Sequence, residues 1–92
     1  MTESKIYVKV TTEWDAEGNI TPTVIHWEDG TRYTIDRILR VDNAASMRAG
    51  GYGLRYKVRL SCEEQNIFDK VRYLFLEKGL TPERWFVEAK GA

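Results

Sequence analysis

The sequence has few of the residues on which disulfide-bonded domains and metal sites depend. It contains one cysteine, Cys62, and one histidine, His26, among 92 residues. A single cysteine cannot close an internal disulfide, so we expect a protein of the reducing cytoplasm. Zinc sites that need several cysteines and histidines are excluded for the same reason, and no cofactor is predicted.

Long apolar runs are also missing. No segment approaches the roughly 20 apolar residues that span a bilayer, and the first residues, MTESKIYVKV, lack the basic and apolar regions of a secretory signal. We therefore expect a cytoplasmic protein without a membrane partner. Net charge is absent as well, because 14 basic side chains balance 14 acidic ones. This balance argues against a strongly basic nucleic-acid protein and against an acidic disordered chain.

The short length limits what the protein can enclose. We expect one domain over residues 1–92 with a single core, and a chain of this size buries only about 60–65% of the surface that it exposes when unfolded. Such a core leaves little room for a deep, dry active site. No pair of nucleophile and base emerges from the residues either, so no catalytic residues and no enzyme activity are predicted.

Alternation of apolar and polar residues is the main pattern that the sequence does contain. Successive side chains of a strand point to opposite faces, so a period of two indicates half-buried strands. Strands of this kind are predicted over residues 5–14, 20–27, 32–41, 54–61 and 84–90. Between two of them lies Asp29-Gly30, a pair typical of a type I′ hairpin turn in which both residues have positive φ.

Residues 61–79 allow two interpretations. Ser61 and Glu64 fit a helix capping box, Gly79 fits a helix end, and apolar residues between them recur at helical spacing. Against a helix, residues 71–76 are rich in strand-forming residues and could turn into the last strand as a hairpin. We predict an all-β fold of about six antiparallel strands in a small barrel or strongly bent sheet. The alternative is α+β, with a helix in 61–79.

The stretch 44–60, AASMRAGGYGLRYKVRL, joins three glycines to a basic strand. A phosphate-binding loop is excluded, because Gly53 leads into an alternating strand and not into a helix. An RNA-recognition octapeptide is excluded too, since Leu54 and Arg55 stand where an aromatic and an apolar residue are needed. What remains is a basic strand face beside a loop. The candidate binding residues are Arg48, Tyr52, Arg55, Lys57 and Arg59.

These cations also have a purely structural interpretation. They can form the solvated face of an amphipathic strand and pair with carboxylates such as Glu13 or Asp36, at about 0.2–1 kcal/mol for each pair. Similarly, His26 and Glu28 have a spacing that two metal ligands could use, but no third histidine or cysteine is available. We interpret His26 as a hairpin residue. Cys62 precedes two glutamates that disfavour its thiolate, so it is not expected to be a nucleophile.

Several segments resemble those of known proteins. WEDGTRYTIDRILRV, AASMRAGGYGLRYKVRL, RYLFLE and RWFVEAK are together similar to a family of small uncharacterised bacterial proteins of unknown function, best represented among Firmicutes. The likeness covers about residues 5–90 and implies a strand at RYLFLE that leads closely into one at RWFVE. The connection 62–70 looks longer here than in that family. RYLFLE and RWFVEA also resemble a C-terminal signature of Y-family-like DNA-damage polymerase proteins of actinobacteria.

The sequence as a whole favours binding over catalysis. We expect a non-catalytic interaction module whose partner is a protein. The alternative is a weak single-stranded nucleic-acid binder that uses the basic strand 55–59 and the loop 48–53, with Tyr52 as an aromatic platform.

Overall fold

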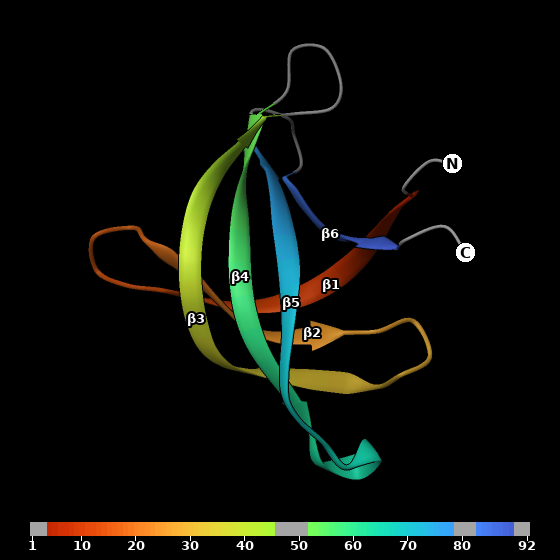
Figure 1. Cartoon of the computed structure of the whole chain (residues 1–92). Coiled ribbons are helices and arrows are strands. Elements are labelled where there is room, and N and C mark those ends of the chain that lie inside the picture. The colour runs from red at the N-terminus through yellow and green to blue at the C-terminus, as the bar shows by residue number, and fades with distance from the viewer. Residues whose placement is uncertain (1–3, 46–51, 79–82, 90–92) are drawn as a thin grey trace.

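The chain folds into a closed barrel of antiparallel strands (Figure 1). The computed structural model describes residues 4–45, 52–78 and 83–89. Within them the strands are β1 (Ser4–Trp14), β2 (Ile20–His26), β3 (Arg32–Ala45), β4 (Tyr52–Cys62), β5 (Ile67–Lys78) and β6 (Arg84–Ala89). Each strand pairs with the next, and β6 returns to pair with β1. The predicted all-β class, with six antiparallel strands in a small barrel, is confirmed.

Residues 61–78 form strand ends joined by one short turn and not a helix, so the α+β alternative is wrong; Gly79, its predicted helix end, lies outside the described residues. β4 runs to Cys62, a single 3-10 turn η1 (Glu63–Gln65) follows, and β5 begins at Ile67. The Ser61 hydroxyl donates to Asp36 on β3 and does not cap a helix. Pairing of β5 with β4 satisfies the backbone of both strands, and this outweighs the local helical pattern. No helix in the described part of the chain is long and apolar enough to cross a membrane.

The core lies inside the barrel and is built around β4 and β5. Val58 and Leu74 are completely buried, and the Trp85 ring packs on the Tyr56 ring with centroids 5.4 Å apart. The buried cluster is Ile25, Tyr56, Val58, Leu60, Leu74, Leu76 and Trp85. Because the even-numbered residues of β4 are committed to this core, its odd-numbered residues must face outward, as the alternation predicts.

Two bulges bend β3 around the barrel. Its pairing with β4 shifts between Ile35 and Arg37, and again between Ile38 and Arg40. Each extra residue reverses the alternation of the strand and increases its bend. As a result Ile38 packs against the core, whereas Leu39, which the alternation predicts as inward, is 38% exposed. Simple alternation from Tyr33 and Ile35 predicts Leu39 to point inward, and the two bulges show that this prediction is wrong.

The β2–β3 hairpin has a three-residue loop. The Gly30 amide donates to the Trp27 carbonyl at 3.0 Å, and the Trp27 amide donates to the Thr31 carbonyl at 2.8 Å. Gly30 has a φ of 93°, but Asp29 is not at positive φ, so the predicted type I′ turn is wrong. A type I turn followed by a left-handed glycine fits these bonds. Asp29 supports the turn through its carboxylate, which accepts the Thr31 amide at 2.8 Å.

Replacing Gly30 tests this loop. A Cβ at Gly30 would meet no atom within 4 Å, so the only penalty of Gly30→Ala is its positive φ. We expect a loss of about 1 kcal/mol in the free energy of unfolding, measured by urea denaturation. Glu28→Ala, in the same loop but without positive φ, is the matched control and should leave stability nearly unchanged. Equal stabilities of the two variants would contradict the loop assignment.

Candidate binding face on strands β3 to β5

The structure brings three of the five predicted binding residues together. Arg55, Lys57 and Arg59 stand on the outer face of β4, on the opposite side from the buried residues of that strand. Arg48 lies outside the described residues. Tyr52 is described only in its backbone, which pairs with Ala45 and Lys78, so its proposed role as a platform stays a prediction.

Strand β3 adds two cations that the sequence pattern did not single out. Arg37 lies directly opposite Arg59, and Arg40 lies directly opposite Lys57. Like charges in opposed positions destabilise a sheet. Arg37 points outward because of the bulge after Ile35. In a regular strand Arg37 would point to the same inner face as Ile35. We refer to the five cations as the basic face: Arg37, Arg40, Arg55, Lys57 and Arg59.

Only part of the basic face is neutralised. Asp42 accepts hydrogen bonds from Arg40 Nε at 2.8 Å and Arg55 Nη2 at 3.3 Å. These bonds, chiefly the one from Arg40, hold the pKa of Asp42 below its usual value. Among the described residues, no carboxylate oxygen lies within 4 Å of the charged groups of Arg37, Lys57 or Arg59. The structural interpretation, pairing of the β4 cations with carboxylates, is borne out for Arg55 alone among the described residues, and its partner is Asp42 on β3 and not Glu13 or Asp36.

An apolar ridge on β5 borders the basic face. The outward residues Val71, Tyr73 and Phe75 lie opposite Arg59, Lys57 and Arg55 respectively. Tyr73 is 46% exposed, and the Arg55 guanidinium lies 5.2 Å from the centre of its ring. An accessible aromatic ring therefore stands beside the cations. The sequence analysis did not single out Tyr73, because its place beside Lys57 depends on the pairing of β5 with β4, which leaves no local pattern.

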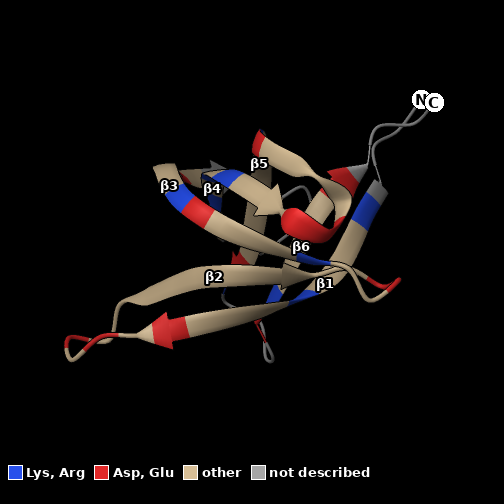
Figure 2. Cartoon of the chain, turned by 90° about the horizontal axis from the view of Figure 1, so that it is seen from below, with Lys and Arg blue, Asp and Glu red and all other residues tan. Residues whose placement is uncertain are grey.

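Acidic residues are concentrated at the ends of the hairpins. Figure 2 shows the tip of the β1–β2 hairpin and the turn η1 in red, whereas blue segments cross β3 and β4. Asp15 is an example of a carboxylate that stabilises a turn. It accepts hydrogen bonds from the backbone amides of Glu17 at 2.9 Å and Asn19 at 2.8 Å. Hydrogen bonds from Asn19 lower the pKa of Asp15, and bonds from Thr31 lower that of Asp29. Zero net charge thus coexists with a basic face because carboxylates are used in turns.

Gly53 has a structural role. A Cβ at this position would lie 2.6 Å from the carbonyl oxygen of Leu76 on β5. Only glycine permits this close approach of the two strands. The other glycines of the triplet, Gly50 and Gly51, lie outside the described residues, so a ligand-binding role of the loop is not tested.

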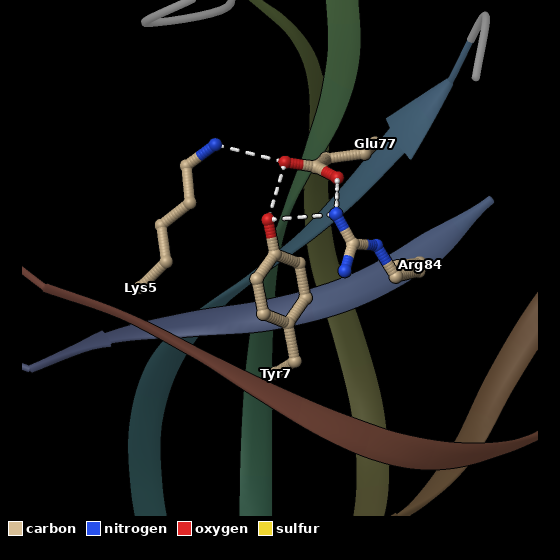
Figure 3. Close-up of polar contacts among 4 residues, drawn as sticks. All are labelled: Lys5, Tyr7, Glu77 and Arg84. Atoms are coloured by element: carbon tan, nitrogen blue, oxygen red, sulfur yellow. Dashed lines mark hydrogen bonds and ion pairs between the residues drawn. The ribbon is translucent and has the colours of Figure 1, made fainter. Parts of the chain in front are cut away.

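A second polar cluster, the closing cluster, joins three strands where the barrel closes (Figure 3). Glu77 on β5 accepts hydrogen bonds from Lys5 Nζ at 2.8 Å and Tyr7 Oη at 2.9 Å, both on β1. Arg84 on β6 lies 3.6 Å from the other carboxylate oxygen and 4.0 Å from the centre of the Tyr7 ring. The Glu77 side chain is only 13% exposed. The closing cluster therefore consists of Lys5, Tyr7, Glu77 and Arg84.

The closing cluster is suited to stability and not to catalysis. The hydrogen bond from Lys5 is the main cause that lowers the pKa of Glu77, with further contributions from Tyr7 and Arg84. A carboxylate held ionised by three partners is a poor general base, because a base near neutrality needs a raised pKa. Its contacts cross from β5 to both β1 and β6, so it fastens the closure of the barrel.

Two further residues considered in the sequence analysis, His26 and Cys62, lie within the strands of the barrel. His26 Nε2 lies 2.7 Å from the Thr11 hydroxyl on the neighbouring strand, where one of the two atoms donates to the other. Cys62 is a buried free thiol at the end of β4. Over residues 4–45, 52–78 and 83–89, no group of three or more histidine, cysteine or acidic side chains could hold a metal ion.

Comparisons with known protein families, curated proteins and solved structures found no match for this chain. The likenesses to the small bacterial family and to the Y-family-like polymerase proteins therefore stay predictions. What the protein binds has to be inferred from the basic face and its neighbours.

Glu77→Gln tests the closing cluster. The folded pKa of Glu77 lies below its unfolded value, so its contribution to stability is present above the unfolded pKa and is lost as the pH falls through the folded pKa. We expect the variant to be less stable at pH 7 and to lose less stability on acidification. Thermal unfolding from neutral to acidic pH measures both. Glu13→Gln, the same change at an exposed end of β1, is the control. If its acid dependence matched that of Glu77→Gln, the cluster would not be the cause.

Proposed function

We propose that the protein is a non-catalytic module that binds single-stranded nucleic acid on its basic face. The main supporting observation is that like charges stand in opposed positions across β3 and β4, Arg37 opposite Arg59 and Arg40 opposite Lys57. Such contacts cost stability unless an anion lies between or above them. A chain of phosphates supplies negative charge at regular intervals and would relieve both of these repulsions at once.

The apolar ridge supports a single strand as the ligand. Proteins that bind single strands combine cations that follow the backbone with aromatic rings on which bases stack. Here Tyr73 offers an exposed ring in register with Lys57, next to the cations. A duplex is the poorer fit, because its sequence is usually read by a helix or a two-stranded ribbon inserted into the major groove, and the cations here lie along the wall of a barrel.

A protein partner is the other source of negative charge. An acidic protein surface could neutralise Arg37, Lys57 and Arg59, but it would not require the Tyr73 ring beside them. The two partners therefore differ in how they depend on Tyr73 and on salt. The buried free thiol of Cys62 is compatible with a cytoplasmic location, which we include in the proposal.

The double variant Lys57→Ala/Arg59→Ala tests the cationic part. For single strands, log affinity falls with log salt by about 0.7 for each phosphate contact, so losing two contacts should flatten the slope by about 1.4. Fluorescence anisotropy with labelled oligothymidylate and oligouridylate, over a range of salt, measures this slope. Lys9→Ala/Arg32→Ala removes the same net charge from exposed positions on β1 and at the start of β3, and it is the control.

Three outcomes would overturn the proposal. One is the absence of oligonucleotide binding by the native protein at low salt. Another is an equal change of slope in the double variant and its control, which would indicate diffuse attraction and no defined face. The third is binding of polyglutamate on the basic face without binding of oligonucleotides, which would assign the face to an acidic protein.

Tyr73 variants test the stacking part. Tyr73→Leu removes the ring, whereas Tyr73→Phe keeps it. Stacking contributes about 1–3 kcal/mol for each base, so Tyr73→Leu should weaken oligonucleotide binding about 5- to 150-fold, and Tyr73→Phe should stay within about twofold. The salt slope should not change, because neither variant removes a charge. Similar affinities of the two variants would show that no base stacks on this ring.

A further inference from the structure

The barrel has an open edge along the second half of β3. β2 pairs with β3 only from Val24 opposite Thr34 to His26 opposite Arg32. β3 continues far beyond this point, and Figure 1 shows its upper part rising away from β2. Over 40–45 it pairs with β4 in unbroken register, and no strand in the described ranges lies on its other side. Half of the backbone donors and acceptors along this edge therefore have no strand partner.

A side chain beside this edge is exposed although it points toward the interior. Val41 lies opposite Tyr56 and shares its face of the sheet. Tyr56 is 4% exposed, whereas Val41 is 49% exposed. The difference arises because β4 has a paired strand on both sides here, whereas β3 is paired only with β4. A strand added next to β3 would cover this valine and extend the core.

We propose that the edge 40–45 of β3 binds an extended segment of a partner protein as an added β-strand. The unpaired amides and carbonyls alternate along the edge, and another polypeptide backbone in extended form matches that alternation. Asp42 pairs with only two of the five cations of the basic face beside this edge, so the remaining positive charge favours acidic residues in the segment, and Val41 on the inner face favours an apolar one. The segment should therefore alternate acidic and apolar residues.

A different chain fits this edge better than a second copy does. The carboxylate that a second copy would bring along the same edge is Asp42, and it already pairs with Arg40 and Arg55. The bulges at Asp36 and Leu39 shorten the regular edge and limit how far two copies could pair. Charge complementarity thus favours an acidic foreign segment. This inference does not rest on nucleic-acid binding, which concerns the outward side chains of the sheet.

The probe is a synthetic peptide of alternating glutamate and valine, titrated into the isotope-labelled protein. We expect chemical-shift changes and slower hydrogen exchange at the amides of 40–45. Two peptides with N-methyl groups on alternate residues are the controls, one for each edge of the peptide. The peptide methylated on its pairing edge should bind about tenfold or more weakly, because N-methylation removes the ladder donors and keeps the side chains. A peptide of alternating lysine and valine should not bind.

Variants of the protein separate the edge from the basic face. Val41→Lys replaces a half-exposed side chain, so the fold should tolerate it, and we expect peptide binding to fall about tenfold while oligonucleotide affinity does not decrease. Val41→Ile should retain peptide binding. The proposal is overturned if the glutamate–valine peptide leaves the amides of 40–45 unperturbed, if both methylated peptides bind as well as the parent, or if the free protein is a dimer with this edge protected.

Discussion

Closure of the sheet by β6 is the interaction on which the rest of the structure depends. The last strand pairs with the first from Ser4 opposite Ala89 to Val8 opposite Trp85. Without this pairing both strands would be free edges, and Trp85 would lose its place against Tyr56 in the core. The closing cluster around Glu77 reinforces the same seam from outside. The closed core is gained by pairing the first strand with the last.

Closure also decides which side chains are left for binding. Once alternate residues of β4 and β5 fill the interior, the remaining residues must line the outer wall, and these are cations on β4 and apolar or aromatic residues on β5. The bulges of β3 then bring Arg37 and Arg40 into register with Arg59 and Lys57. Meanwhile Asp15 and Asp29 are held in turns by backbone amides. Charge is separated because turns and sheet faces select different residues.

Strand β3 belongs to both proposed surfaces. Its first half closes the barrel against β2, whereas its second half has an open edge and carries outward cations. Arg40 stands where the two surfaces meet, since it faces outward from the first regular residue of the open edge. A module of this design could hold a nucleic-acid strand on the wall of its sheet and a protein segment along its edge, because side chains recognise the first and the backbone recognises the second.

The sequence by itself determined the strand class, the positions of most strands and the outward direction of Arg55, Lys57 and Arg59. Alternation is a local property, so it is readable without knowing any neighbour. Tertiary structure alone decided that 67–78 pairs as a strand, that bulges turn Arg37 outward and expose Leu39, and that Asp42 is the carboxylate that binds Arg55. The position of Tyr73 beside the basic face was decided in the same way. These features depend on which strand lies alongside which, and pairing between residues distant in sequence leaves no local pattern.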